Sequence, residues 1–452
     1  MKPILAPDRP RLAREIGATA RLAAPLVLGQ LSAVGMSVID VVLAGHLDGH
    51  TLGSVAVGTN VWVLGLVVII GVMMAVQPSV AQLHGARRIA AIGPLFRQSL
   101  WLAFPFGVLV GLALALAGPL LFDLIGVEAS LIADATAFLR AIAFGAPALA
   151  LFFALRGLSE GIGLTRPTMY FGLFGLILLA PLGYVLMYGA FGMPRMGALG
   201  CGIATAIVLW VQCLAFAWYL ARRTHYRALG LFARWDPPDR RAIGELLRIG
   251  VPMSVTLFME ASLFVAIALA IGRLGAEIAA SHQIAINVSS VAFMVAVGIG
   301  MATTVRVGHA VGRGDHAGVR RAAAAGMLMT LVTQVISASL MLGIPGVIAA
   351  LYTGDRAVVA LAAQLLILAG IFQLSDGLQA AANGALRGLK DTRIPMFYTT
   401  FAYWGVGMPV GWWLAFEAGH GVRGMWFGLI AGLSMAAILL TWRFWRLALR
   451  LR

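Results

Sequence analysis

Cysteine and charge are both scarce in this sequence. Its 452 residues include two cysteines, and 11% of them are charged, whereas soluble domains carry about 25% charged residues. Two cysteines exclude a disulfide-rich secreted domain. Cys201 and Cys213 also cannot pair with each other, because about 18 Å of helical rise separates them within one predicted helix. With 61% hydrophobic residues the chain is not disordered, and a mean hydropathy of +0.92 leaves little room for a soluble domain.

Long apolar runs fill most of the chain. A membrane-spanning helix needs about 20 mostly apolar residues, and twelve runs of that kind can be recognised. The sequence therefore predicts an all-α membrane protein with twelve transmembrane helices. Their approximate ranges are 22–44, 54–80, 98–122, 135–156, 168–191, 198–221, 246–271, 281–304, 321–345, 358–384, 395–417 and 424–445.

The net charge of +15 follows the alternation of these spans. If both termini lie on one side, 28 of the 33 basic residues fall on that side and four on the other: Arg195, Arg273, Arg356 and Arg423. Basic loops stay in the cytoplasm, so we expect both termini to be cytoplasmic. The charge then reflects topology and contact with the lipid bilayer, and no nucleic-acid partner is predicted.

The sequence repeats itself along the chain at one fixed offset of 227 residues (252 minus 25 for the first pair below), which we call the repeat offset. It places Pro25 on Pro252, Gly45 on Gly272, Asn60 on Asn287, Gly157 on Gly384, and Trp218 on Trp445. Each half holds six spans, so we predict an N-lobe at 1–226 and a C-lobe at 227–452, the C-lobe preceded by a basic cytoplasmic linker. Halves that enter from the same side are related by a pseudo-two-fold axis along the membrane normal. Such an architecture favours a carrier over a channel.

Three acidic residues lie inside apolar runs, namely Asp40, Glu260 and Asp376. Charges inside a membrane are costly and by default indicate function. The repeat does not copy them, which suggests that they serve a site rather than the scaffold. Asp40 has a simpler alternative role, because it lies near the outer end of its span and can reach interfacial water. The one basic residue predicted within a span, Arg140, belongs to the other half from Glu260 and Asp376.

A buried carboxylate binds a proton or a cation readily. If an organic cation and a coupling ion compete for the same carboxylate, the result is antiport. We therefore expect these acids to couple ions, with a possible Na+ site at Glu260 and Asp376. Possible supporting polar residues are Gln283, Asn287, Gln373, Gln379 and Asn383. The alternative for these five is ordinary hydrogen bonding between membrane helices.

Aromatic rings and methionines suit flat, apolar cations through stacking and cation–π attraction. Possible substrate contacts are Met253, Met259, Tyr398, Tyr403 and Trp404. Packing and interfacial anchoring are the alternatives for such residues in a membrane protein.

Long motifs around these acids resemble the multidrug and toxic compound extrusion (MATE) transporters, and within them the bacterial NorM-like branch. The motifs include VIDVVLAGHL around Asp40, FMEASLFVAIALAIGRLG around Glu260 and AANGALRGLKDTRIP after Asp376. The resemblance covers essentially the full length. It implies a twelve-helix, two-lobe fold, efflux of cationic drugs or toxins by alternating access, and a multi-pass protein of the bacterial inner membrane that acts as a monomer. It also places Asp40, Glu260 and Asp376 on the acidic positions of the family.

Three positions depart from the pattern of Na+-coupled relatives. A tyrosine is common four residues before the acid of the tenth span, where this chain has Phe372, and asparagines commonly flank the proline of the fifth span, where it has Leu179 and Gly183. Hard cations need several oxygen ligands. We therefore expect H+ rather than Na+ as the coupling ion, and no other cofactor.

Two other functions remain as alternatives. A lipid-linked saccharide flippase of the same superfamily would place more basic residues in its central cavity, to bind pyrophosphate. An integral-membrane enzyme, the more remote alternative, would need a catalytic constellation. The eight histidines show no metal spacing such as HExxH, so no catalytic or metal-binding residues are assigned and we expect no enzyme activity.

Overall fold

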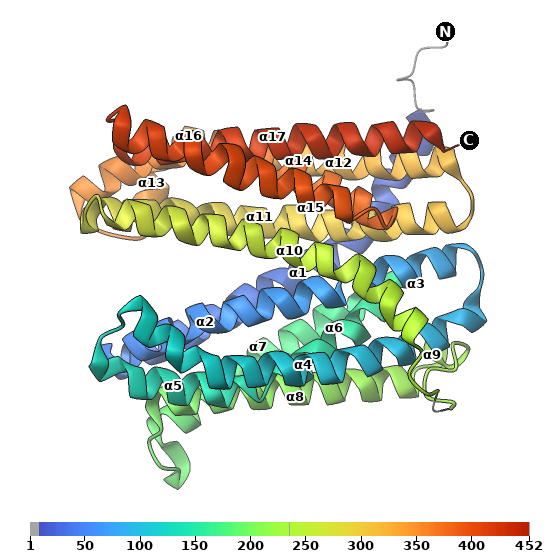
Figure 1. The fold of residues 1–452 in the computed structure, drawn as a ribbon, viewed down its shortest axis with the longest axis horizontal. Coiled ribbons are helices and arrows are strands. Elements are labelled where there is room, and N and C mark those ends of the chain that lie inside the picture. Colours follow the sequence, from blue (N-terminus) through green and yellow to red (C-terminus); the bar gives the residue numbers. More distant parts are fainter. Residues whose placement is uncertain (1–8, 235, 452) are drawn as a thin grey trace. The chain divides into compact units, whose positions relative to one another are not determined.

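The computed structural model describes residues 9–234 and 236–451, and this part of the chain is helical without any strand. The all-α class is thereby confirmed. The helices, shown in Figure 1, are α1 (Arg9–Leu47), α2 (Gly49–Met73), α3 (Val76–Gly85), α4 (Ile89–Ile125), α5 (Ala129–Ala143), α6 (Ala146–Gly161), α7 (Arg166–Tyr188), η1 (Ala190–Gly192), α8 (Gly197–Arg222), α9 (Thr224–Arg227), α10 (Arg240–Gly272), α11 (Ala276–Gly312), α12 (His316–Gly343), α13 (Pro345–Ala350), α14 (Arg356–Gly388), α15 (Arg393–Thr400), η2 (Phe401–Gly407), α16 (Met408–Trp412), η3 (Trp413–Glu417) and α17 (Gly421–Arg450).

Every predicted span falls on a helical segment. Within the described residues ten helices are long and apolar enough to cross a membrane, and α5 and α6, which meet at a bend of 41°, meet the same length and composition criterion when taken together. The predicted span at 395–417 corresponds to four short pieces, α15, η2, α16 and η3. Two of these, η2 and η3, are π-helical, so this span does not form one regular α-helix. π-Helical turns occur frequently at functional sites.

This broken span, α15–η3, packs closely on α17 through glycines. A Cβ atom added to Gly428 of α17 would lie 2.3 Å from the Gly411 Cα, and one added to Gly424 would lie 2.5 Å from the Ala415 backbone nitrogen. Small residues allow membrane helices to approach this closely. The contact therefore depends on the absence of side chains at these positions.

The helix boundaries reproduce the internal repeat. The segment α2–α3 spans 49–85, and the repeat offset carries both of its ends onto those of α11, which spans 276–312. The bent pair α5–α6 at 129–161 corresponds in the same way to the continuous helix α14 at 356–388. The second half thus repeats the helical plan of the first, with breaks at different places.

Contacts group the chain into two compact units, one of residues 28–254 and one of residues up to 27 together with 255–452. We call them the 28–254 unit and the 255–452 unit. The division points, after Val27 and after Ser254, are themselves related by the repeat offset, and each follows a proline (Pro25 or Pro252) by two residues. These units group residues by their contacts, whereas the predicted lobes divide the chain by its sequence repeat. The lobe boundary at 226/227 therefore stays a prediction.

Opposite ends of the 28–254 unit carry different loops. Between α1 and α2, Asp48 accepts a hydrogen bond from the Thr51 backbone N–H at 2.6 Å and pairs with Arg195 at 2.9 Å. These interactions hold the pKa of Asp48 below its ordinary value. The hydrogen bonds from Thr51 have the largest effect, and Arg195 adds a smaller one. Figure 1 shows this loop and η1 at one end of the unit, with the α3–α4 turn and α9 at the other.

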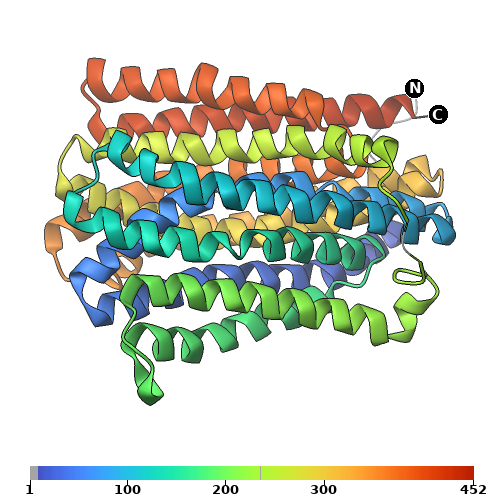
Figure 2. The same ribbon diagram turned by 60° about the horizontal axis from the view of Figure 1, so that its bottom comes forward.

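The segment that follows α9 is fixed to α4. Arg97 donates to Asp236 at 2.7 Å and to the Gly230 carbonyl at 2.7 Å, and Gln98 donates to the Pro237 carbonyl at 2.8 Å. Tyr226 is buried against Ser159, with 2.7 Å between the hydroxyls, and burial raises its pKa to about 12. The described residues of the linker between the two halves therefore belong to the 28–254 unit (Figure 2).

Candidate functional site

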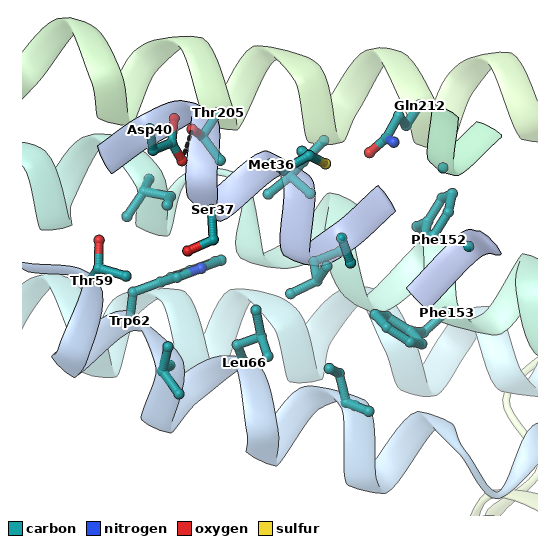
Figure 3. A pocket seen from close by; sticks show the side chains of 18 of the residues that line it. Met36, Ser37, Asp40, Thr59, Trp62, Leu66, Phe152, Phe153, Thr205 and Gln212 are labelled. Atoms are coloured by element: carbon teal, nitrogen blue, oxygen red, sulfur yellow. Dashed lines mark hydrogen bonds between the residues drawn. The ribbon is translucent and has the colours of Figure 1, made fainter. Parts of the chain in front are cut away.

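Asp40 lies on α1 and faces α8. Its two carboxylate oxygens accept long hydrogen bonds from the Cys201 thiol and the Thr205 hydroxyl, each at 3.4 Å. Cys201 and Thr205 are four residues apart on one face of α8, so both reach the same carboxylate. Figure 3 shows the Thr205 contact. The carboxylate is partly buried among neutral donors.

Asp40 borders a cavity of about 250 Å³ within the 28–254 unit. The cavity walls are mostly apolar, with a few hydroxyl groups such as those of Ser37 and Thr59. In Figure 3, Asp40 and Thr205 lie at one end of the labelled side chains and Phe152, Phe153 and Gln212 at the other. The ring-bearing residues lining it are Trp62, Phe138, Phe152 and Phe153.

A buried ion pair lies at the far end of this cavity. Arg156 lines the cavity and donates to Glu160 at 2.6 Å and to Gln30 at 2.9 Å. Gln77 donates to the other Glu160 oxygen at 2.8 Å, so the arginine charge is balanced locally. Asp40 and Gln30 are ten residues apart on α1, which corresponds to about 15 Å of helical rise. The cavity is therefore elongated, with one unbalanced carboxylate at one end.

Asp376 lies on α14 in the interior of the 255–452 unit and is 3% exposed. Its Oδ1 atom has no hydrogen-bond partner among the described residues, and the same is true of the Gln334 Oε1 and Thr330 Oγ1 atoms. A Cβ atom added to Gly377, the next residue after Asp376, would lie within 3.0 Å of both Gln334 and Thr330. Buried oxygens without partners are costly, and a proton or a bound cation would satisfy them.

Glu260 on α10 belongs to the same cluster. Its charge interacts with those of Asp376 and Arg387, and the Tyr403 hydroxyl interacts with all three. The Nε atom of Arg387 is buried and has no hydrogen-bond partner in the described part of the chain. Glu260 thus has Arg387 as one charged neighbour and Asp376 as the other. When both are ionised the cluster carries one net negative charge, and a single added proton neutralises it.

A basic residue of the second half lies close to these acids, although the sequence predicts none within its spans. The tenth span is predicted to end near 384, and α14 continues to Gly388 with Arg387 on its last turn. Arg140, the predicted intramembrane arginine, is exposed on α5. The acids of the 255–452 unit therefore have a basic neighbour of their own.

The five predicted supporting residues divide into two groups. Gln373, Gln379 and Asn383 are buried on α14 with Asp376. Gln379 donates to the Tyr403 hydroxyl at 2.6 Å, and Gln373 donates to the Ser289 carbonyl at 2.9 Å. The other two, Gln283 and Asn287, are exposed on α11, and Asn287 accepts from Tyr352 at 3.0 Å. The structure thus places three of the five near the acid.

The predicted substrate contacts do not gather around one cavity. Met253 is buried in the core of the 28–254 unit, whereas the other four lie in the 255–452 unit. There the Trp404 indole donates to the Met259 carbonyl at 3.2 Å, and Tyr403 is fully buried against Gln379. Tyr398 packs on a separate apolar cluster. Their role in binding substrate stays a prediction.

Sequence reasoning missed several residues that contact the acids. Thr205 and Cys201 lie in the motif GCGIATAIV, and their spacing of four residues within an apolar helix is the signal that could have found them. Thr330 and Gln334, which lie beside Gly377 rather than in contact with Asp376 itself, carry the same signal in α12. The rings of the Asp40 cavity carry none, because aromatic residues are common throughout a membrane protein.

Comparison with known proteins agrees with this architecture. The MatE family model matches residues 25–185 and again 252–413, once in each half. The probable multidrug resistance protein NorM of Xanthomonas campestris is 51% identical over 98% of this chain and 96% of its own length. The multidrug resistance protein PmpM of Pseudomonas aeruginosa is 44% identical over 97% and 93%.

Solved structures share the fold at low identity. The eukaryotic MATE transporter AtDTX14 superposes with a TM-score of 0.86 at 21% identity, covering 98% of this chain and all of that one. An outward-facing MATE family transporter gives 0.88 at 19% identity, covering 97% and 96%. The predicted twelve-helix, two-lobe fold fits these structures. With both halves matched by the family model and close relatives over nearly the whole length, this chain belongs to the MATE family of multi-pass membrane transporters.

Proposed function

We propose that this chain exports amphipathic organic cations in exchange for protons. The observation that carries the proposal is the elongated apolar cavity with Asp40 at one end. The relatives named above are called multidrug resistance proteins, and drug efflux is the function that this cavity supports best.

The cavity suits a cation that is flat and mostly apolar. Asp40 is the only carboxylate among the residues that line it, and the one lining arginine is paired with Glu160. The field inside therefore favours positive charge. Ring faces such as that of Trp62 attract cations by up to about 2 kcal/mol when water is excluded. Apolar walls without dense hydrogen bonding accept many substrates, which suits multidrug export.

The acids of the 255–452 unit are the proposed coupling site. An added proton removes the net charge of the Glu260, Asp376 and Arg387 cluster. When this proton leaves, the cluster is again anionic and attracts another proton. Export follows when protonation and substrate binding favour opposite states of the transporter. The cavity acid, Asp40, then binds substrate or a proton, but not both.

One contact favours a proton over Na+ at this site. Phe372 packs between Phe264 and Trp426, with ring centroids 6.2 and 6.0 Å away, so it offers no ligand atom. Na+ needs several oxygen ligands at once, whereas a proton needs only one carboxylate.

The flippase alternative receives less support. A pyrophosphate substrate needs several cationic side chains directed into the cavity. The cavity of the 28–254 unit is lined by a single arginine, already engaged by Glu160 and Gln30.

Topology completes the proposal. The loops rich in arginine face the cytoplasm, both termini included, and the protein acts as a monomer in the bacterial inner membrane by alternating access. Excess positive charge retains loops on the cytoplasmic side.

The proposal can be tested in bacterial cells that lack their own drug pumps. Cells producing the transporter should exclude ethidium and survive cationic antiseptics, and Asp376→Asn should reduce both to the level of cells without it. Glu277→Gln, an exposed acid at the start of α11, serves as the matched control and should behave as the unmodified protein. Full resistance with Asp376→Asn at equal membrane abundance would contradict the coupling role.

A further inference from the structure

A basic pocket of about 440 Å³ lies at one end of the 255–452 unit. It is formed where α11 meets α12 and where α14 meets the last turns of α17. Its polar side chains are those of His316, Lys390, Asp391, Arg443 and Arg450, which define what we call the basic pocket. Leu389 and Leu447 are among its aliphatic wall residues. This pocket takes no part in the transport site described above.

The pocket has an excess of positive charge, and an ion pair fixes the position of one of its arginines. Arg443 donates to Asp391 at 2.8 and 3.4 Å, and both side chains are about one-fifth exposed. This pair fixes the orientation of the Arg443 guanidinium. With Lys390 and Arg450 the lining side chains carry a formal charge of +2 when His316 is neutral. No carboxylate in the described part of the chain forms an ion pair with Arg450.

Lys390 occupies a strained backbone position. Its φ angle is 59°, in the left-handed region that favours glycine. The residue that the repeat offset pairs with it in the first half is Gly163, with a φ of 90°. A residue kept in an unfavourable conformation often serves a function. Here a lysine replaces the glycine that the turn prefers, and its side chain lines the pocket.

The internal repeat shows that the basic residues of this pocket are not explained by membrane topology alone. Loops of both halves obey the same preference for cytoplasmic arginine. However, Lys390, Arg443 and His316 correspond to Gly163, Phe216 and Ile89 in the first half. These three basic side chains therefore occur in one half only, which topology alone does not require.

The position along α17 indicates the depth of the pocket. Trp442 and Trp445 lie on this helix, where tryptophans mark the interface between membrane and water. Arg443, Leu447 and Arg450 follow at spacings of four and three, so they share one face of the helix. The pocket thus lies at the level of lipid headgroups, with aliphatic side chains beside its cations.

We propose that the basic pocket binds a phosphate-bearing anion, whose source is the phosphodiester headgroup of an anionic phospholipid or a soluble phosphate. Lys390, Arg443 and Arg450 hold the phosphate oxygens, and Leu389 and Leu447 contact the adjoining glyceride carbons when the anion is a lipid. The proposal is independent of the transported substrate and of the coupling ion.

Binding can be measured on the full-length protein in a neutral detergent. Short-chain phosphatidylglycerol should raise the Tm at concentrations where phosphatidylcholine of equal chain length does not. The double variant Lys390→Gly, Arg450→Gln should need at least about tenfold more phosphatidylglycerol for the same shift. Glycine suits the left-handed turn at 390, so this variant should fold. Arg446→Gln, an exposed arginine on the same helix, is the matched control and should respond as the unmodified protein.

The two sources give different results. If inorganic phosphate alone raises the Tm and phosphatidylglycerol adds nothing, the pocket binds a soluble anion. If phosphatidylglycerol acts at far lower concentration than inorganic phosphate, the source is lipid. An equal response of the double variant and the unmodified protein to both anions would overturn the proposal. If the double variant does not fold, Arg450→Gln alone decides, with a weaker response expected and an unchanged one contradicting the site.

Discussion

The three intramembrane acids differ in their surroundings. Asp40 has neutral donors and an open cavity beside it, whereas Glu260 and Asp376 share a buried cluster with Arg387. This difference suggests a division of roles at the residue scale. We propose that Asp40 recognises the positive charge of the substrate and that the other two acids hold the coupling proton.

Asp40 and its donors should contribute unequally to substrate binding. We expect Asp40→Asn to weaken the binding of a fluorescent cation by at least about tenfold, because an ionic partner is lost. Thr205→Val should weaken it by less than about fivefold, since a neutral hydrogen bond is worth about 0.5–1.5 kcal/mol and this one is long at 3.4 Å. Fluorescence titration of the purified protein measures both. A larger effect of Thr205→Val than of Asp40→Asn would contradict these roles.

Glu260 and Arg387 should be energetically coupled. Removing one partner leaves the other charged and unbalanced in the interior, so Glu260→Gln and Arg387→Met should each lower the Tm. The double variant should be more stable than the sum of the two predicts, by a coupling energy of about 0.5–3 kcal/mol. Thermal unfolding of the four proteins in one detergent gives this cycle. Strictly additive effects would show that the two groups do not interact.

Sequence reasoning identifies the acids but not their partners. Asp40, Glu260 and Asp376 are recognisable because a charge in an apolar run is unusual. Thr205 is distant in sequence from Asp40, and Arg387 from Glu260, and nothing in a single chain indicates which helices lie side by side. The helical position of Arg387 also does not follow from the sequence, because hydropathy alone does not show where a polar-ended helix stops.

At the scale of elements, the predicted spans agree with the helices while the irregularities do not follow from the sequence. The bend between α5 and α6 and the π-helical segments η2 and η3 depend on packing against neighbours. In the first half the span equivalent to α15–η3 is the single helix α7. Equivalent segments of the two halves thus form a regular helix in the first half and a broken helix in the second.

The glycine contact between the broken span α15–η3 and α17 is a testable consequence of this packing. Gly428→Ala should lower the stability by about 1–3 kcal/mol, because the added carbon overlaps the Gly411 backbone. Gly244→Ala is the matched control, since a Cβ atom on this helical glycine of α10 meets no atom within 4 Å. It should be neutral or stabilising. Equal Tm values for the two variants would contradict close packing at Gly428.

At the scale of the whole molecule, the repeat is the feature that the sequence predicted best. The repeat offset recurs in the helix boundaries, in the two matches to the family model and in the division points of the contact units. What the repeat does not copy is equally informative. The acids at 40, 260 and 376 and three side chains of the basic pocket (His316, Lys390 and Arg443) each break it, and each lies where we place a binding function.

The contact units contain information that a linear division of the chain does not provide. Residues 9–27 of α1 belong with 255–452, where Glu15 pairs with Arg306 at 2.7 Å. Residues 240–254 of α10 belong in turn with 28–254. Each of these helices therefore begins in one unit and ends in the other. A sequence pattern of spans and loops cannot show this exchange, because it depends on tertiary contacts.

Transport under separately imposed gradients tests the central claim most directly. The purified protein would be reconstituted in proteoliposomes with a fluorescent organic cation, and either a pH gradient or a Na+ gradient would be imposed while the other is held at zero. The account predicts that cation movement follows the pH gradient and is indifferent to Na+. Movement that follows the Na+ gradient and ignores pH would contradict proton coupling.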